Sequence, residues 1–225
     1  IMIPAVDYFV IMGYDYYYPG SSTAGPNDPL YHFGSTYNYT LSKTITNYVD
    51  AGCPKNKLVM GLPYYGFEWP TTSQTVPSST TGNGVARTYA YVRNNTSGNY
   101  STANHQFDND SYTNIYTFSS GGNNKQCFIS EESAFRKRLQ HVNNTGIAGI
   151  GIWALGYDDG YSEFWTAIND FFTDCKADSC AGSIHDFGGP TKNYYNNEDY
   201  TWTIAPPGSS SIAVSFSTFD VELNY

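Results

Sequence analysis

The sequence predicts an α/β protein that contains part of a (β/α)8 TIM barrel, and three observations predict this fold. Apolar runs at residues 8–12, 57–62 and 146–155 lack the alternation that would leave one face in water. Such runs are typical of strands buried on both faces of a parallel sheet. Each run ends in aromatic or acidic residues, and helical patterns follow along the chain. Because three strands cannot close a barrel, we expect them to be its last three, with the first five upstream of Ile1.

The first strand carries the first candidates for chemistry. Residues 6–18 read VDYFVIMGYDYYY, an apolar segment that leads directly into tyrosines and an aspartate. Side chains at the carboxyl ends of parallel strands are where α/β folds place their sites, so Met12, Tyr14 and Asp15 are candidate site residues. The alternative is that Tyr14 and Asp15 only bind the strand end to a neighbouring loop, and this stretch alone leaves both interpretations open.

A helix and a second strand follow the first strand. Residues 19–38 are rich in Gly, Pro, Ser and Asn, which predicts a loop at the site edge of the sheet. Thr40 is a candidate helix cap, and the apolar residues behind it recur at helical spacing: Leu41, Ile45, Tyr48 and Val49. Gly52 and Pro54 end this helix before the strand at 57–62. The order strand, helix, strand predicts a βαβ unit.

The stretch from about 67 to 127 departs from this alternation of strands and helices. It is polar and too long for a structureless loop, so we expect a small β-rich insertion with strands near 85–92 and 115–118. Ser130 is then the expected cap of a helix whose buried face carries Phe135, Leu139 and Val142. After the third apolar strand, aromatic residues at helical spacing predict a last helix: Tyr161, Phe164, Trp165, Ile168, Phe171 and Phe172.

Composition limits the class of ligand. The 225 residues carry a net charge of −9 with only 11 Lys and Arg, which argues against nucleic acid as a partner. No apolar stretch reaches the roughly 20 residues of a membrane helix. Abundant tyrosine and few charges favour a secreted, extracellular protein that binds a neutral polar ligand. Sugars fit this description, because their faces stack on aromatic rings and their hydroxyls need neutral partners.

The cysteines predict no metal site. None of Cys53, Cys127, Cys175 and Cys180 forms a C-x-x-C, and no histidine lies near them at ligand spacing, so we expect neither a metal nor another cofactor. Cys175 and Cys180 are close enough in sequence for a local disulfide in an oxidising compartment. Cys53 and Cys127 either pair with each other or stay as buried thiols, and the sequence leaves this open.

Three motifs in the correct order resemble the family 18 glycoside hydrolases, the chitinase family. VDYFVIMGYDYYYPG, KLVMGLPYYG and GIAGIGIWALGYDDGYSEFW are similar to that family's sixth, seventh and eighth barrel strands. The resemblance covers residues 1–174, with the insertion at about 67–127. It implies a secreted glycosidase that cleaves β-1,4-linked N-acetylglucosamine polymers. Chitin or N-acetylglucosamine oligosaccharides are the implied partners, and the resemblance implies no oligomeric state.

The resemblance also implies roles for individual residues. Met12 to Asp15 matches the family's Met-x-Tyr-Asp motif, in which the substrate's own 2-acetamido group is the nucleophile. Tyr14 would hold that group, and Asp15 would accept hydrogen bonds near the scissile bond. Tyr65 matches an aromatic residue of the same subsite, and Trp153 matches the subsite floor. Packing in the core is the alternative for Trp153.

Two features of the sequence depart from the family. Phe67 stands where many members have an arginine that contacts substrate. The motif Asp-x-x-Asp-x-Asp-x-Glu, whose glutamate is the general acid, is absent from these residues. We therefore expect the full-length parent to be the enzyme and this fragment alone to be inactive. The alternatives are a non-catalytic chitin-binding lectin on the same barrel, an endo-N-acetylglucosaminidase, or a peptidoglycan hydrolase.

A second domain is expected after the barrel. Residues 175–180 form a linker, and residues 181–225 alternate apolar and polar positions as antiparallel strands do. This part is similar to the amino-terminal half of a CUB-like β sandwich, an all-β domain. Some members of that family bind calcium through a glutamate like Glu222 and a later aspartate, but no metal is assigned here.

Overall fold

The structure, a computed structural model, describes residues 3–35, 39–172, 211 and 213–215. The chain divides into two compact units, Ile1–Phe172 and Thr173–Tyr225. The expected disulfide between Cys175 and Cys180 and most of the CUB-like segment lie outside the described residues. Residues 213–215 are described and lie in no strand.

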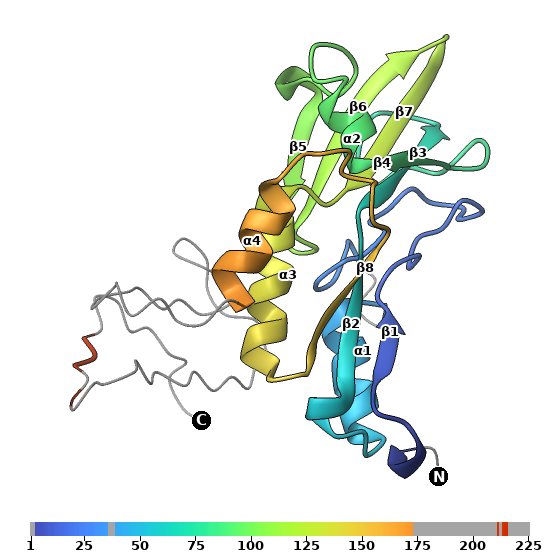
Figure 1. The fold of residues 1–225 in the computed structure, drawn as a ribbon. Coiled ribbons are helices and arrows are strands. Elements are labelled where there is room, and N and C mark those ends of the chain that lie inside the picture. Colours follow the sequence, from blue (N-terminus) through green and yellow to red (C-terminus); the bar gives the residue numbers. More distant parts are fainter. Residues whose placement is uncertain (1–2, 36–38, 173–210, 212, 216–225) are drawn as a thin grey trace. The chain divides into compact units, whose positions relative to one another are not determined.

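The first unit contains a three-stranded parallel sheet with the order β1-β2-β8 (Figure 1). The strands are β1 (Phe9–Met12), β2 (Leu58–Pro63) and β8 (Gly149–Trp153). β1 and β8 both pair in parallel with β2. All three predicted strands are therefore confirmed, each within or next to its apolar run.

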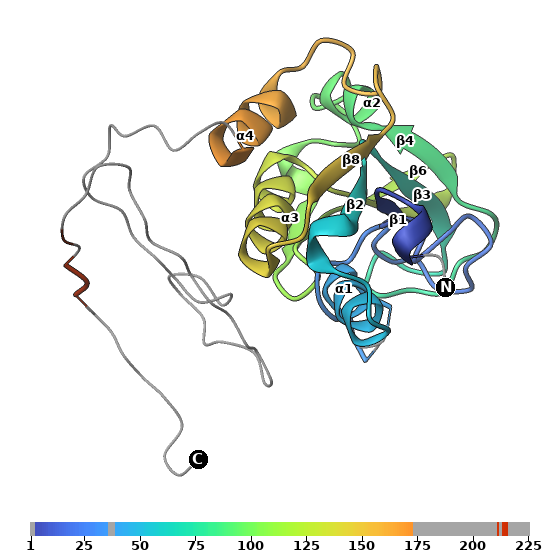
Figure 2. The same cartoon turned by 60° about the horizontal axis from the view of Figure 1, so that its bottom comes forward.

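The two faces of this sheet differ. One face buries Ile11, Met60 and Leu62, whereas on the other face Val10 and Met12 are exposed, Met12 to 72%. The prediction that the first strand is buried on both faces is thus wrong for the described structure. The physical reason is that the helices α1 (Leu41–Asp50) and α3 (Glu132–Thr145) lie alongside the sheet without covering its second face (Figure 2).

Helix α1 begins where the sequence predicts. Thr40 has an extended backbone conformation, and its side chain accepts a hydrogen bond from the Lys43 amide at 3.1 Å. Leu41 and Ile45 are buried beneath the helix, while Tyr48 is largely exposed. The short 3-10 turn Lys55–Lys57 then leads into β2.

Removing this cap is expected to weaken the fold modestly. Thr40→Ala leaves the Lys43 amide without its partner, and we expect the free energy of unfolding to fall by about 1 kcal/mol. Urea denaturation measures this loss. Thr40→Ser keeps the hydroxyl and serves as the control, with an expected change of less than about 0.5 kcal/mol. Equal stabilities for the alanine and serine variants would contradict the capping role.

The start of α3 differs from the prediction. Glu131 occupies the cap position without a side-chain bond to the helix, and Ser130 is not the cap. The Ser130 hydroxyl instead donates to the carboxylate of Asp28, at 2.9 Å to Oδ1. The expected apolar face of this helix is confirmed, since Phe135, Leu139 and Val142 are buried. The last helix is α4 (Glu163–Phe172), in which Phe164 and Ala167 are buried.

The part of the chain between β2 and α3 forms a five-stranded antiparallel sheet with the order β4-β3-β7-β6-β5. Its strands are β3 (Tyr65–Thr71), β4 (Val85–Thr88), β5 (His105–Asp108), β6 (Thr113–Ser120) and β7 (Asn123–Ile129). β3 follows β2 with a single residue between them, so the two sheets join at the carboxyl end of β2 (Figure 1).

The predicted strand at 85–92 is confirmed only in its first half, which is β4. Its second half is the short helix α2 (Tyr89–Arg93), because the Thr88 side chain accepts from the Tyr91 amide and caps a helical turn. Cys127 lies on β7 as a free, buried thiol, and burial raises the pKa of that thiol. Cys53 is also a free, buried thiol. Of the two alternatives that the sequence left open for Cys53 and Cys127, the structure therefore shows two separate thiols and no disulfide between them.

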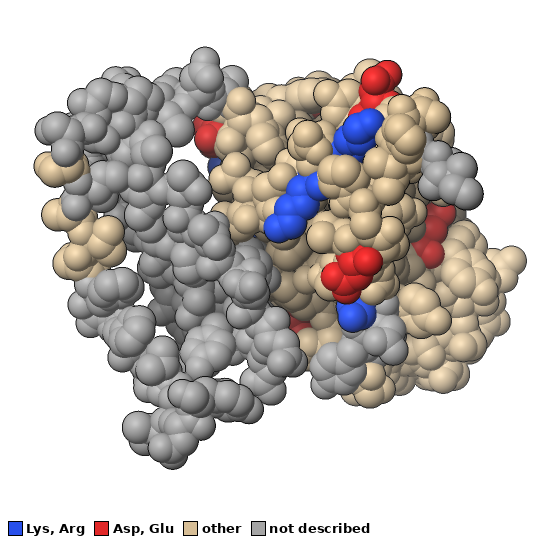
Figure 3. Space-filling view, turned by 90° about the horizontal axis from the view of Figure 1, so that it is seen from below, with Lys and Arg blue, Asp and Glu red and all other residues tan. Residues whose placement is uncertain are grey.

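Charged side chains are sparse on the face of the molecule seen in Figure 3. On the face seen in Figure 3, the Lys and Arg residues are interspersed with Asp and Glu on a largely uncharged surface. Within the described residues, no helix combines the length and the apolar character needed to span a membrane.

Candidate functional site

Tyr14, Tyr65 and Trp153 converge at the carboxyl edge of the parallel sheet. Tyr14 lies just beyond β1, Tyr65 begins β3 just beyond β2, and Trp153 ends β8. The ring of Tyr14 is 6.4 Å from that of Trp153 and 6.2 Å from that of Tyr65. Residues far apart in the sequence meet here because the carboxyl ends of parallel strands share one edge.

A glycine makes room for this arrangement. A Cβ at Gly61 would lie 2.7 Å from the Ile11 carbonyl oxygen and 3.4 Å from the Tyr14 ring. Any larger residue would therefore push β1 and the Tyr14 ring away from β2. The glycine in KLVMGL thus belongs to the site as much as the tyrosine does.

Asp15 is held in an unusual backbone conformation. Its φ is 60°, in the left-handed region that side-chain-bearing residues seldom adopt. The Asp15 amide donates to Oδ1 of Asn27 at 2.7 Å, and the Tyr65 hydroxyl donates to Oδ1 of Asp15 at 2.7 Å. Strain of this kind persists only where the surroundings enforce it, and here Asn27 and Tyr65 do so.

Asn27 is a site residue that the sequence did not reveal. It is fully buried, and its Nδ2 donates to the Tyr65 carbonyl oxygen at 2.9 Å. Its own carbonyl oxygen accepts from the Tyr16 amide at 3.0 Å. Asn27 therefore fixes the backbone on both sides of the Asp15–Tyr65 contact. The only signal in the sequence was its position in a loop that follows β1, which it shares with many other polar residues.

The candidate residues differ in how they meet solvent. Trp153 is 55% exposed, so it is no part of the core in this structure, while Tyr65 is only 7% exposed. Met12 is the last residue of β1, two residues before Tyr14, and is 72% exposed. Met12 and Trp153 are thus the exposed candidate residues, whereas Tyr65 is buried.

Burial raises the pKa of the hydroxyl groups of Tyr14 and Tyr65. Desolvation raises the pKa of Tyr14, and the charge of Asp15 raises it further. Burial and the hydrogen bond to Asp15 raise the pKa of Tyr65. Both hydroxyls therefore stay protonated at neutral pH and can donate hydrogen bonds.

Phe67 is part of the core of the antiparallel sheet. Its ring lies 5.5 Å from Tyr65 and 5.5 Å from Trp69, and it is buried. Phe67 therefore supports Tyr65 from behind and offers no polar group to the site.

Each glutamate in the described residues has a polar partner away from this site. Glu68 binds Arg87 with both carboxylate oxygens at 3.1 Å, and Glu163 binds Arg93 at 2.7 Å. The other two are Glu131, bound by Tyr116, and Glu132, bound by Arg136. The described residues also contain no group of His, Cys, Asp or Glu that could hold a metal ion.

The sequence of this chain matches a known protein family. The model for "Glycosyl hydrolases family 18" matches residues 2–158. A probable endochitinase of Caenorhabditis elegans is 24% identical over 168 residues, which cover 70% of this chain and 27% of that protein. The chain therefore spans well under half the length of this relative.

Solved structures share the fold. A class V chitinase from Nicotiana tobaccum has a TM-score of 0.65 at 21% identity, covering 76% of this chain and 50% of that one. A chitinase-like agglutinin from Robinia pseudoacacia has a TM-score of 0.63 at 22% identity, covering 76% of this chain and 48% of that one. About three quarters of this chain thus shares its fold with the matched half of each of these structures.

Proposed function

Because this chain belongs to the glycosyl hydrolases family 18, we propose that its parent protein is secreted and cleaves β-1,4-linked N-acetylglucosamine polymers such as chitin. The observation that carries the proposal is the meeting of Tyr14, Asp15, Tyr65 and Trp153 at one edge of the parallel sheet. We further propose that this chain supplies the last three strands of the barrel. Strands of the parent protein then cover the face on which Met12 is exposed.

In this proposal Trp153 stacks on the sugar whose bond is broken. Its exposed ring supplies a flat apolar surface that matches a pyranose face. Tyr14, whose ring lies 6.4 Å away, donates a hydrogen bond to the 2-acetamido oxygen of the same sugar. That bond holds the oxygen for attack on the anomeric carbon, which forms an oxazolinium ion as the glycosidic oxygen leaves with a proton. Water then attacks the anomeric carbon and opens the oxazolinium ring, which gives a product with retained anomeric configuration.

Asp15 acts on the electrostatics of this step. Its carboxylate lies at the strand end beside Tyr14 and accepts a hydrogen bond from Tyr65 at 2.7 Å. A negative charge held there favours the positive charge that develops on the acetamido group and the anomeric carbon. Tyr65 fixes the direction of the carboxylate, because its ring is buried against Phe67.

In this proposal the proton for the leaving oxygen comes from the glutamate of the family's Asp-x-x-Asp-x-Asp-x-Glu motif, which the parent protein supplies because these 225 residues lack that motif. The four glutamates among the described residues are bound elsewhere, as the Glu68–Arg87 pair illustrates. A lectin that lacks the acid is the second candidate, and the same observation favours it. The agglutinin of similar fold is a reason to test it. Hydrolysis of N-glycan cores or of peptidoglycan would use the same groups on other acetamido sugars.

The test uses the parent protein and N-acetylglucosamine tetramers. We expect hydrolysis by the wild type, and we expect Trp153→Ala to weaken oligomer binding by roughly 1–3 kcal/mol through loss of the stacking surface. Calorimetry measures the binding, and Trp165→Ala is the control, since Trp165 is similarly exposed but lies on α4. Binding without hydrolysis by the wild type would favour the lectin. Unchanged binding by Trp153→Ala would contradict the proposed site.

A further inference from the structure

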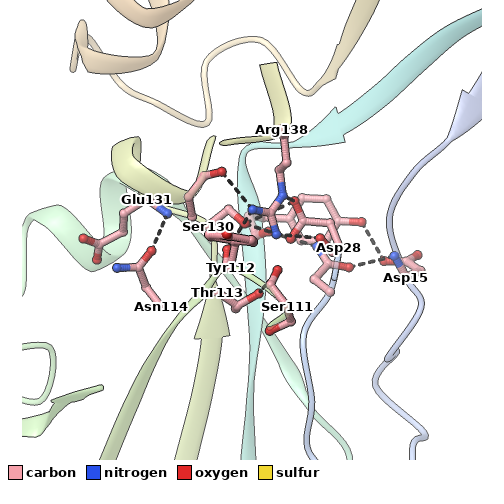
Figure 4. Close-up of polar contacts among 12 residues, drawn as sticks. Asp15, Asp28, Ser111, Tyr112, Thr113, Asn114, Ser130, Glu131 and Arg138 are labelled. Carbon is pink, nitrogen blue, oxygen red and sulfur yellow. Dashed lines mark hydrogen bonds and ion pairs between the residues drawn. The ribbon is translucent and has the colours of Figure 1, made fainter. Parts of the chain in front are cut away.

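A fully buried ion pair lies directly behind the candidate site. Arg138 of α3 donates from Nε to Oδ2 of Asp28 at 2.5 Å, and neither side chain is exposed. The Ser130 hydroxyl donates to the same carboxylate. Figure 4 shows Arg138 and Ser130 turned toward Asp28, with Asp15 beyond it. Burying two charges is costly, and removing one partner of such a pair leaves the other charge buried without compensation.

Arg138 also binds the backbone on which Asp28 lies. Its Nη2 donates to the Asp28 carbonyl oxygen at 2.5 Å, and its Nη1 donates to the carbonyl oxygens of Tyr112 at 2.8 Å and Ala134 at 2.9 Å. The planar guanidinium thereby joins its own helix to two other segments, at Asp28 and at Tyr112, through a fixed fork of donors that a single ammonium group does not offer. The loop after β1 is fixed in place at Asp28.

The residue next to Asp28 is Asn27, which holds the amides of Asp15 and Tyr16. A rigid anchor at Asp28 therefore sets where the Asn27 side chain and carbonyl oxygen lie. Those two oxygens in turn keep Asp15 in its left-handed conformation, with its carboxylate beneath the Tyr65 hydroxyl. The chain of contacts runs from helix α3 to the candidate site without a break.

We propose that Arg138, through its buried pair with Asp28, is a positioning residue that keeps Asp15 oriented for the reaction. This inference rests on the proposed function for its catalytic part. Arg138 touches no group of the candidate site, so its effect passes through Asn27. The alternative is that the pair stabilises the fold alone.

The deciding variant removes both charges at once. Asp28→Asn with Arg138→Met keeps the side-chain volumes similar and leaves no unpaired buried charge. Hydrogen exchange of the Asp15 and Tyr16 amides, measured in the parent protein, reports directly on the contacts with Asn27. We expect their exchange to accelerate about tenfold or more, while the amides of β2 keep their wild-type protection.

Kinetics with N-acetylglucosamine tetramers give the second measurement. A misplaced Asp15 should lower kcat roughly 10-fold to 100-fold, with KM within about threefold of the wild type. Arg136→Met is the matched control, because Arg136 lies on the same helix but pairs with Glu132 and Asp170 at the surface. We expect it to change neither the exchange nor kcat.

Arg138→Lys keeps the test decisive if the double variant fails to fold. Lysine retains a charge beside Asp28 but loses the fork that holds three carbonyl oxygens, so we expect a smaller acceleration of the same amides. Unchanged exchange at Asp15 and Tyr16, or unchanged kcat in an active parent, overturns the proposal. If the wild type hydrolyses nothing, the proposed function fails, while the exchange measurement still decides whether Arg138 positions Asp15.

Discussion

Replacing Tyr14 by phenylalanine is expected to lower kcat of the parent protein about tenfold to a few hundredfold. The change removes one hydroxyl and keeps the ring that lies between Trp153 and Tyr65. In the proposed mechanism this hydroxyl steadies the acetamido oxygen, which reaches the anomeric carbon only as the bond breaks. Its loss should therefore affect the transition state more than substrate binding, with a smaller change in KM.

Steady-state kinetics on N-acetylglucosamine tetramers measure this effect, and glucose tetramers give the chemical control. Oligomers without the 2-acetamido group should remain uncleaved by the wild type. Tyr91→Phe is a matched variant, because Tyr91 is an exposed tyrosine on α2 whose ring contacts Arg87 and Tyr100. Hydrolysis of glucose oligomers at rates similar to those of chitin oligomers would rule out substrate-assisted catalysis and the role of Tyr14.

Replacing Arg138 alone by methionine is expected to destabilise the protein by about 3–5 kcal/mol, because the Asp28 carboxylate would stay buried without its counter-charge. The Tyr112 carbonyl oxygen would lose its partner as well. Urea denaturation of the parent protein measures the change. Adding Asp28→Asn to the same variant should recover part of the loss, since it removes the unpaired charge.

The same helix provides the control for this prediction. Arg136 pairs with Glu132 and Asp170 at the surface, where salt bridges contribute little, and Arg136→Met should change stability by less than about 1 kcal/mol. A similar loss for Arg136→Met and Arg138→Met would contradict the assigned importance of the buried pair. A loss below about 1 kcal/mol for Arg138→Met would do so too.

Local patterns determined the parallel sheet and its first helix. The apolar run before Tyr14 predicted a strand, which is confirmed, although the expected burial of both its faces is not. Thr40 carries its capping oxygen within one helical turn of its partner. Placing Tyr14 and Trp153 together required only that both follow parallel strands, because such strands end at one edge.

Short local patterns failed where a second hydrogen-bonding arrangement competes with the expected one. Ser130 resembles a helix cap, yet its hydroxyl binds the carboxylate of Asp28, about a hundred residues earlier in the chain. The stretch at Tyr89 has the aromatic and branched residues of a strand, but the Thr88 cap turns it into α2. In both cases the sequence permits two hydrogen-bonding states: a distant carboxylate selects one for Ser130, and the local cap at Thr88 selects the helix at Tyr89.

The sequence by itself determined the parallel strands, the helix α1, and the tyrosines and tryptophan at the strand ends. Only the tertiary structure decided that Asn27 holds Asp15 and that Arg138 anchors the loop. Nothing local distinguishes Arg138 from Arg136, since both are arginines on one helix. Two residues apart on a helix point to roughly opposite faces, so one side chain meets a buried aspartate and the other meets solvent. Which face is buried depends on how the chain folds back over a hundred residues, and spacing along the sequence does not carry that information.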